Sequence, residues 1–185
     1  MATVTAGMTV SLDGFVADSQ GSASRLFSDL ADLGDTDYMK TAIEQTGAVV
    51  MGRRTFEMGD PDSYVGTYEF QVPIFVVTHH PPAVAPQQDE HLTFTFVTEG
   101  VETAIEQAKA AAGDKVVQVP GGAGVVQQVL GAGLVDELRV DVMPVVLGGG
   151  LRMLDNLDPE RFRLEKLGTC EIGARTSLGF RVLNR

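Results

Sequence analysis

Short apolar runs typical of β-strands alternate with helical patterns through the middle of the chain, and this alternation constrains the fold more than any other feature. Residues 48–51 are apolar throughout, which is typical of a strand buried on both faces. Similar runs recur at residues 73–78, 94–98 and 115–119, and the helical patterns lie at 103–112 and 125–130. Alternation of this kind with short connections predicts a mostly parallel sheet covered by helices on both sides.

The ends of the chain add further elements to this sheet. Residues 4–12 alternate loosely and are rich in Val and Thr, so they predict a first strand. Residues 19–34 predict a loop or lid, and residues 35–45 predict a helix that Asp35 or Thr36 caps. Three strand patterns without a comparable helix between them end the chain, at residues 138–147, 162–169 and 176–183. We therefore expect one three-layer α/β domain over residues 1–185, with antiparallel strands at its C-terminal end.

The sharpest local motif is a strand that runs into three glycines and then into a helix. Gly121, Gly122 and Gly124 follow the apolar run at residues 115–119 and precede the helical pattern. Such a turn leaves backbone N–H groups free at a positive helix terminus, where phosphate groups bind. The alternative is a plain strand-to-helix turn that needs a positive φ angle. The spacing matches neither the dinucleotide fingerprint nor a P-loop.

A second strand end carries two adjacent arginines. Gly52, Arg53 and Arg54 follow the buried run at residues 48–51, and no other Lys or Arg occurs until Lys109. Guanidinium groups form forked hydrogen bonds with phosphate, although arginines paired with Glu57 or Asp60 on an exposed helical turn are the simpler alternative. Because parallel strands present their carboxyl ends at one edge, the two strand ends together predict a site for a ligand with several phosphates.

A third strand end, Thr78-His79-His80, joins the same predicted edge. Side chains of adjacent residues in an extended strand point to opposite sides, so His79 and His80 cannot both face one metal ion. We therefore expect no metal site here. Hydrogen bonding or stacking with a nucleotide and a plain surface position remain the two alternatives for these histidines.

Composition excludes several other classes of protein. The chain has 14 Lys and Arg against 25 Asp and Glu, a formal charge of −11, which argues against nucleic-acid and anionic-membrane binding. Cys170 is the single cysteine, so a reducing cytoplasm suits the chain and no internal disulfide is possible. No stretch has the apolar length of a membrane span. We expect a cytoplasmic protein.

Five motifs in this order resemble the dihydrofolate reductase-like superfamily, and within it the reductase domain of riboflavin biosynthesis, the C-terminal domain of the bifunctional deaminase-reductase. The motifs are SLDGFVA at 11–17, MGRRTFE at 51–57, VTHHP at 77–81, VPGGAG at 119–124 and VDELRVDVMPVVLGGG at 135–150. The resemblance implies NADPH as cofactor and no metal. It also implies hydride transfer to a C=N type bond of a pyrimidine- or pterin-like substrate.

The resemblance also implies roles for individual residues. Gly52, Arg53, Arg54 and Thr55 match the positions that hold the 2′-phosphate and pyrophosphate, and Thr78, His79 and His80 those beside the adenosine half. Residues of the glycine turn match those under the pyrophosphate and nicotinamide, namely Gly121, Gly122, Ala123, Gly124 and Val125. Leu12, Asp13 and Gly14 match positions near the nicotinamide and the substrate.

The substrate half departs from the family pattern. Dihydrofolate reductase carries a carboxylate near the start of the helix before the MGR strand, and Asp35 or Asp37 aligns with it, although helix capping is a simpler role for either. Ser22, Ser24 and Arg25 are candidate donors to a substrate phosphate. The functional prediction is a reductase resembling 5-amino-6-(5-phosphoribosylamino)uracil reductase. The alternatives are a dihydrofolate or pteridine reductase and a non-catalytic nucleotide-binding module. A homodimer is expected through the C-terminal strands.

Overall fold

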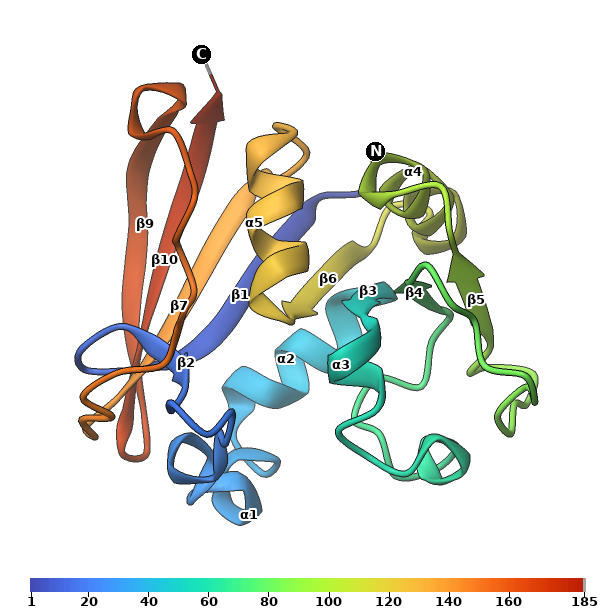
Figure 1. The fold of residues 1–185 in the computed structure, drawn as a ribbon, viewed down its shortest axis with the longest axis horizontal. Helices are drawn as coiled ribbons and strands as arrows, with labels where there is room; N and C mark the ends of the chain where they lie inside the picture. Colours follow the sequence, from blue (N-terminus) through green and yellow to red (C-terminus); the bar gives the residue numbers. More distant parts are fainter. Residues whose placement is uncertain (185) are drawn as a thin grey trace.

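The computed structural model describes residues 1–184, which form one central eight-stranded sheet with helices on both faces (Figure 1). Its strand order is β5-β4-β3-β6-β1-β7-β10-β9. The first six of these strands run parallel to their neighbours, whereas β10 is antiparallel to both β7 and β9. The strands are β1 (Val4–Ser11), β3 (Thr46–Gly52), β4 (Ile74–Val77), β5 (Phe94–Val97), β6 (Val116–Gly121), β7 (Glu137–Met143), β9 (Phe162–Ile172) and β10 (Arg175–Asn184).

This architecture confirms the predicted fold class, a mostly parallel sheet with antiparallel C-terminal strands. The helices are α1 (Leu30–Leu33), α2 (Asp37–Gln45), α3 (Arg53–Phe56), α4 (Val101–Ala112) and α5 (Ala123–Gly131). Three further short helical turns are η1 (Ser24–Phe27), η2 (Pro61–Ser63) and η3 (Pro159–Arg161). None of the helices within residues 1–184 has the length and apolar character needed to cross a membrane.

The boundaries differ from the sequence expectations at several places, and two of these differences have a clear local reason. Helix α2 begins at Asp37 because Thr36 caps it, its Oγ1 accepting a hydrogen bond from Met39 N at 3.2 Å. Strand β7 ends at Met143, four residues earlier than predicted, since Pro144 has no N–H to continue the ladder. Residues 19–34, predicted as loop, contain η1 and α1.

A second, two-stranded sheet was not predicted from the sequence. It pairs β2 (Phe15–Ala17) with β8 (Leu151–Arg152), and β8 is only two residues long. A strand of that length carries no periodicity that could reveal it. The guanidinium of Arg152 lies 4.2 Å from the centre of the Phe15 ring, which joins the two strands by a cation–π contact.

The two faces of the main sheet are covered in different ways. Apolar side chains of β1, β3 and β6 pack against α4 and α5 in one core, to which Val4, Ala48, Val50 and Val117 contribute. Because side chains alternate along a strand, Val49 and Met51 of β3 face the opposite side, where they join an aromatic cluster around Phe56. Helix α2 lies on that second side but has no fully buried residue.

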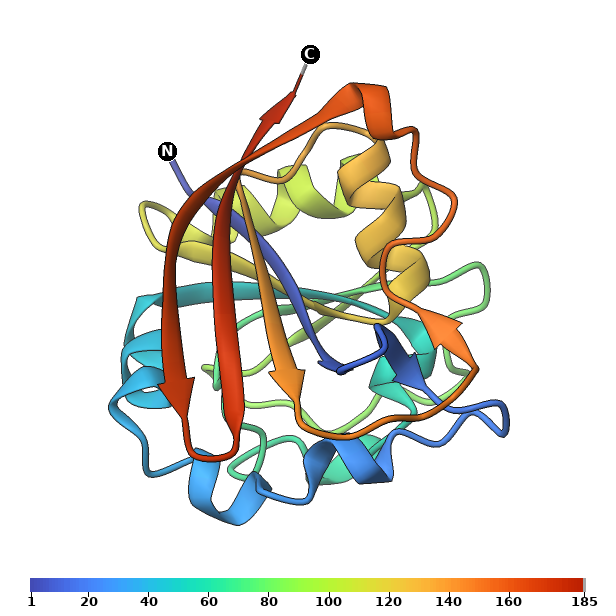
Figure 2. The same ribbon diagram turned by 90° about the vertical axis from the view of Figure 1, so that its left-hand side faces the viewer.

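The long antiparallel hairpin of β9 and β10 extends the sheet on the side of β7. Figure 2 shows this hairpin in front, with the segment of η1 and α1 below its turn. Arg175, at the start of β10, bonds there to Asp29, immediately before α1. The hairpin and the segment before α2 therefore close one end of the space between α2 and the sheet.

Candidate functional site

Three parallel strands end side by side at the carboxyl edge of the sheet. Gly52 of β3 pairs with Val77 of β4, and Met51 pairs with Gly121 of β6. The structure thus brings together the glycine turn, the arginine pair and the Thr78-His79-His80 segment, as the parallel arrangement predicts. The peptide bond between Gly121 and Gly122 is cis.

Close packing at this edge leaves little room for a side chain at two of the glycines. A Cβ at Gly121 would lie 3.0 Å from Met8 Cε, and Gly121 has a φ of +139°, which non-glycine residues rarely adopt. A Cβ at Gly52 would lie 3.0 Å from Val125 Cγ2. At Gly124, by contrast, a Cβ would meet no atom within 4 Å. The edge is therefore closely packed around Gly52 and Gly121, and it is open at Gly124 in the first turn of α5.

Backbone and guanidinium donors gather at the same edge. Gly122 is the N-cap of α5 and has no side chain that could bond the N–H groups of the first turn. These groups belong to Ala123, Gly124 and Val125, and Val125 N donates to Gly122 O. Arg53 and Arg54 open α3 and are exposed, with Arg53 Nε 3.7 Å from Glu57 Oε1. This combination of a helix N-terminus with guanidinium groups favours phosphate binding.

The remaining residues predicted at this edge have mixed surroundings. Thr55 is half-buried, and its Oγ1 would lie 3.4 Å from a Cβ at Gly122. Thr78 is buried, and its Oγ1 accepts a hydrogen bond from His80 N at 3.1 Å, so this hydroxyl shapes the turn. His79 and His80 are exposed. The backbone of this segment is fixed, whereas its imidazoles remain accessible.

The turn at Leu12, Asp13 and Gly14 anchors a distant loop. The Asp13 carboxylate accepts hydrogen bonds from Leu147 N at 3.1 Å and Gly148 N at 2.7 Å. Hydrogen bonding to Ser11 and to these two amides lowers the pKa of Asp13 to about 2. Leu12 is exposed, and Gly14 has a φ of +86°. The Asp13 carboxylate is therefore already engaged by backbone amides of the protein itself. Its role near a substrate stays a prediction.

Asp35 and Asp37 lie on the surface at the start of α2. Both are exposed, Thr36 between them provides the cap, and neither carboxylate lines the cavity described next. A catalytic role for either residue stays a prediction. Ser22 and Ser24 bond each other at 3.0 Å, and Arg25 Nη1 donates to Val146 O at 3.0 Å, so these three side chains have partners within the protein.

A cavity of about 590 Å³ lies between α2 and the sheet, next to the carboxyl edge. Its size falls within the range of about 300 to 1,000 Å³ that is typical of small-molecule sites. The sheet side contributes polar groups at alternate positions of its strands, which are Thr5 and Thr9 of β1, Gln118 of β6, Arg139 and Asp141 of β7, and Arg175 of β10. The opposite side is largely apolar, with Phe27, Leu30, Leu33, Tyr38, Met39 and Tyr68 among its residues.

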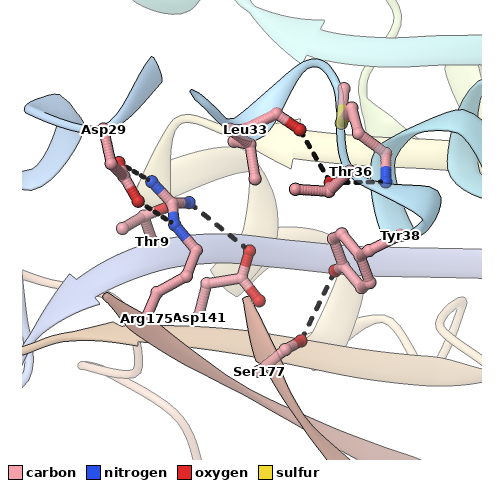
Figure 3. A network of polar contacts seen from close by, with 9 residues as sticks. Thr9, Asp29, Leu33, Thr36, Tyr38, Asp141, Arg175 and Ser177 are labelled. Atoms are coloured by element: carbon pink, nitrogen blue, oxygen red, sulfur yellow. Dashed lines mark hydrogen bonds and ion pairs between the residues drawn. The ribbon is translucent and has the colours of Figure 1, made fainter. Parts of the chain in front are cut away.

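A charged network forms the floor of this cavity (Figure 3). The Arg175 side chain is 1 % exposed and binds the Asp29 carboxylate through two hydrogen bonds, Nε to Oδ2 at 2.9 Å and Nη2 to Oδ1 at 2.5 Å. Its Nη1 donates to Thr9 Oγ1 at 3.1 Å and lies 3.7 Å from Asp141 Oδ2. Hydrogen bonding from Arg175 lowers the pKa of Asp29. Each of the three guanidinium nitrogen atoms of this buried arginine therefore faces at least one acceptor of the protein.

Sequence reasoning missed the residues of this floor. Thr9, Asp141 and Ser177 are register partners across β1, β7 and β10, and Arg175 lies two residues from Ser177 on the same strand. The sequence does show polar residues at alternate positions of β7, namely Arg139 and Asp141. Only the pairing register of β1, β7 and β10, which are far apart in sequence, brings these residues together with Thr9 and Arg175.

The histidines and carboxylates of the described chain do not cluster as metal ligands do. Within residues 1–184, no group of three or more His, Cys, Asp or Glu side chains is arranged to hold a metal ion.

Comparisons with known proteins cover nearly the whole chain. A family model described as the RibD C-terminal domain matches residues 2–178. The Bacillus subtilis (strain 168) protein YwjB, described as uncharacterized, is 31% identical over 175 residues, which are 94% of each chain.

Solved structures share the fold. A candidate riboflavin biosynthesis protein from Shewanella sp. PV-4 aligns with a TM-score of 0.75 at 21% identity over the full length of both chains. Dihydrofolate reductase from Enterococcus faecalis, complexed with NADP(H), aligns with a TM-score of 0.60 at 18% identity over 98% of this chain and 97% of that one. The fold is therefore dihydrofolate reductase-like.

Proposed function

Because the chain belongs to the RibD C-terminal domain family, a family of NADPH-dependent reductases, we propose that it reduces a small nitrogen heterocycle with NADPH. The observation that carries the proposal is the meeting of Gly52, Arg53 and Arg54 with the Gly121–Gly122 turn at one sheet edge beside a cavity. Donors for phosphate and space for a planar ring thus lie next to each other.

The residues at the edge suit a dinucleotide phosphate. Arg53 and Arg54 are exposed and would hold the 2′-phosphate, and the first turn of α5 would face the pyrophosphate. A larger residue at position 121 would contact Met8. A larger residue at position 124 would project into open space, which a bound phosphate would need. Thr55, Thr78, His79 and His80 border the same edge.

The cofactor, when bound, supplies a hydride from its nicotinamide ring. The protein's part is to orient the two rings and to exclude water, for which the apolar wall of the cavity is suited. Burial raises the pKa of Tyr68 well above its ordinary value, with a further contribution from Glu69, so this phenol stays protonated in the cavity wall.

We propose Asp35 or Asp37 as the group that donates a proton to the reduced substrate, because the family pattern has a carboxylate near the start of this helix. A pH–rate profile of Asp35→Asn and Asp37→Asn tests it, since loss of one limb marks the carboxylate that transfers the proton. An unchanged profile in both variants removes these residues from the mechanism.

The test of the cofactor is a calorimetric titration with NADPH and NADH. Each charge-assisted contact to the 2′-phosphate contributes about 1.5 to 3 kcal/mol, so NADPH is expected to bind at least ten times more tightly than NADH. Arg53→Ala combined with Arg54→Ala is expected to remove this preference. Equal affinities in the unaltered protein contradict the cofactor assignment.

Turnover of any pterin or aminouracil excludes the alternative of a non-catalytic nucleotide-binding module.

Two further expectations concern the assembly and the location of the protein. We propose a homodimer through the C-terminal strands, because Leu164, Leu167 and Leu183 are exposed on β9 and β10. Sedimentation that gives only a monomer at micromolar concentration contradicts it. A cytoplasmic location stays a prediction from the single cysteine.

A further inference from the structure

Two polar side chains on the sheet side of the cavity have no hydrogen-bond partner in the protein. Gln118 of β6 and Thr5 of β1 line the cavity and are register partners on neighbouring strands. Within residues 1–184, neither of the two side chains forms a hydrogen bond. Arg175 on the same side of the cavity, by contrast, bonds to Asp29 through two of its nitrogen atoms. The hydrogen-bonding groups of Gln118 and Thr5 are therefore unused.

These groups are open to the cavity. In the described part of the chain, Asp141 Oδ1 is the unpartnered polar atom of a non-exposed side chain that is closed off from its surroundings. The amide atoms of Gln118 also lack a partner but are not closed off, so they have accessible surface in the cavity that the residue lines. Gln118 is half-buried and Thr5 is only 3 % exposed, so a ligand would reach the amide of Gln118 more readily.

A glutamine is unusual at this place in the sheet. Strand β6 lies between β3 and β1, and inner strands of parallel sheets are typically apolar on both faces. Val117 and Val119 are fully buried in the core against α4 and α5, whereas Gln118 between them points to the α2 side. An amide without a partner does not stabilise the fold there. Binding of a ligand gives this residue a function.

The chemistry of the amide indicates which ligand group it can bind. A glutamine carboxamide has a donor and an acceptor side by side, so it forms two hydrogen bonds with a ring edge that presents an N–H beside a C=O, as a lactam does. Met39 and Ala42 of α2 and Met51 of β3 line the same cavity. Their apolar surface suits the faces of a flat ring.

Gln118 also lies at a suitable distance from the cofactor edge. It precedes Gly121 by three residues of β6, which corresponds to about 10 Å along a strand. Two fused rings with their substituents span most of that length. A bicyclic substrate can therefore pair with Gln118 at one end and place its other end near the Gly121–Gly122 turn.

Resting on the proposed function, we propose that Gln118 determines substrate specificity by pairing with a lactam edge of the heterocycle. The carboxamide nitrogen donates to the ring C=O, and the carboxamide oxygen accepts from the ring N–H. Thr5 lies beside the amide on β1 and adds a hydroxyl group on the same side. This contact is separate from Arg53 and Arg54, which would hold a cofactor phosphate.

A matched pair of ligands tests the pairing. Pterin presents a lactam edge, and 3-methylpterin carries a methyl group in place of the hydrogen on the nitrogen of that edge. Each compound is titrated by calorimetry with and without saturating NADP⁺. Pterin is expected to bind at least tenfold more tightly, because methylation removes one hydrogen bond and displaces the other. Equal binding of the two compounds, or no binding of pterin, overturns the proposal.

A variant pair assigns the preference to Gln118. Gln118→Met keeps the length of the side chain and removes both hydrogen-bonding groups, so it is expected to weaken pterin binding at least tenfold and to abolish the preference over 3-methylpterin. Gln107→Met is the matched control, because Gln107 is exposed on α4, on the other face of the sheet. A preference for pterin that survives in Gln118→Met, or an equal loss in Gln107→Met, overturns the role of Gln118.

A stability measurement separates lost binding from lost structure. Because the Gln118 side chain makes no hydrogen bond within residues 1–184, Gln118→Met is expected to unfold at a temperature no lower than the parent and to bind NADP⁺ with unchanged affinity. A lowered unfolding temperature together with weaker NADP⁺ binding would show that Gln118 supports the fold, which contradicts the proposal.

The two proposals fail in different ways. Absence of NADP⁺ binding by the unaltered protein contradicts the reductase function, and the pair of pterins then still judges Gln118 without cofactor. Preserved NADP⁺ binding without a preference for pterin contradicts only the inference about Gln118.

Discussion

The carboxyl edge and the cavity floor are adjacent but are built from different parts of the chain. At the edge, the binding groups are backbone N–H groups and two arginines that follow directly after strands β3 and β6. On the floor they are side chains of β1, β7 and β10, held by an arginine that bonds to a residue 146 positions away. The edge depends on local turns, whereas the floor depends on how distant strands are paired.

This difference implies different sensitivities. Added side-chain atoms should harm the edge, where Gly52 and Gly121 pack against Val125 and Met8. Lost charges should harm the floor, where Arg175, Asp29 and Asp141 compensate one another away from solvent. The variants that follow test each sensitivity in turn.

The largest effect is expected from Arg175→Met. This change leaves the carboxylates of Asp29 and Asp141 without their buried cation, which typically destabilises a protein by about 3–5 kcal/mol. Urea unfolding measures the loss. Arg181→Met is the matched control on the same strand, because its pair with Glu165 is 55 % exposed on both sides and contributes at most about 1 kcal/mol. Similar losses in both variants would contradict the role of the network.

A smaller effect is expected from Gly121→Ala at the edge. The positive φ of Gly121 and the contact with Met8 Cε predict a loss of about 1–3 kcal/mol in stability, together with weaker NADPH binding. Gly131→Ala is the control at the other end of α5, where a Cβ meets no atom within 4 Å. Thermal unfolding should leave the control equal to the parent or up to about 1 kcal/mol more stable. A Gly121→Ala protein as stable as the control would show that the edge is not tightly packed.

Acid should act on the floor through Asp29. Its folded-state pKa lies below the ordinary value of 3.8, so its contribution to stability is complete above that value and is lost as the pH falls further. The free energy of unfolding is therefore expected to decline more steeply below pH 3.8 in the parent than in Asp29→Asn. Urea titrations at a series of pH values give both slopes, and parallel curves would remove Asp29 from the acid response.

The smallest effect is expected from Glu57→Gln, which releases Arg53. The two side chains are 49 % and 54 % exposed, so stability should change by less than about 1 kcal/mol. NADPH should bind slightly more tightly at low salt, and the gain should disappear at high salt because the groups are screened. A gain of more than tenfold, or one that persists at high salt, would mean that Glu57 blocks the site.

The same contrast explains what the sequence could predict. The sheet and the edge were predictable because apolar runs, Gly52 and the Gly121–Gly122 turn are local signals whose meaning does not depend on the rest of the chain. Asp29 and Arg175 gave no such signal, since each looks like a surface residue until the β9–β10 hairpin brings them together. The capping alternatives at α2 were resolved only by the Thr36 side chain.

Composition was informative in one respect and misleading in another. A net charge of −11 argues against nucleic acid, but it also hides the local excess of cations at Arg53 and Arg54. Charges are screened over about 8 Å at physiological salt, so the nearby arginines outweigh distant carboxylates. The pairing of Arg139 with Glu137 could not be predicted without the fold.

Met8 is where the edge and the cavity meet, and it offers the most direct measurement. Its Cε lies 3.0 Å from the position of a Cβ at Gly121, and the residue also lines the cavity. In protein labelled with ¹³C at the methionine methyl groups, NADPH is expected to shift the Met8 resonance and to leave the distant, exposed Met1 unchanged. An unshifted Met8 at saturating NADPH, or equal shifts at Met1, would contradict a cofactor site at this edge.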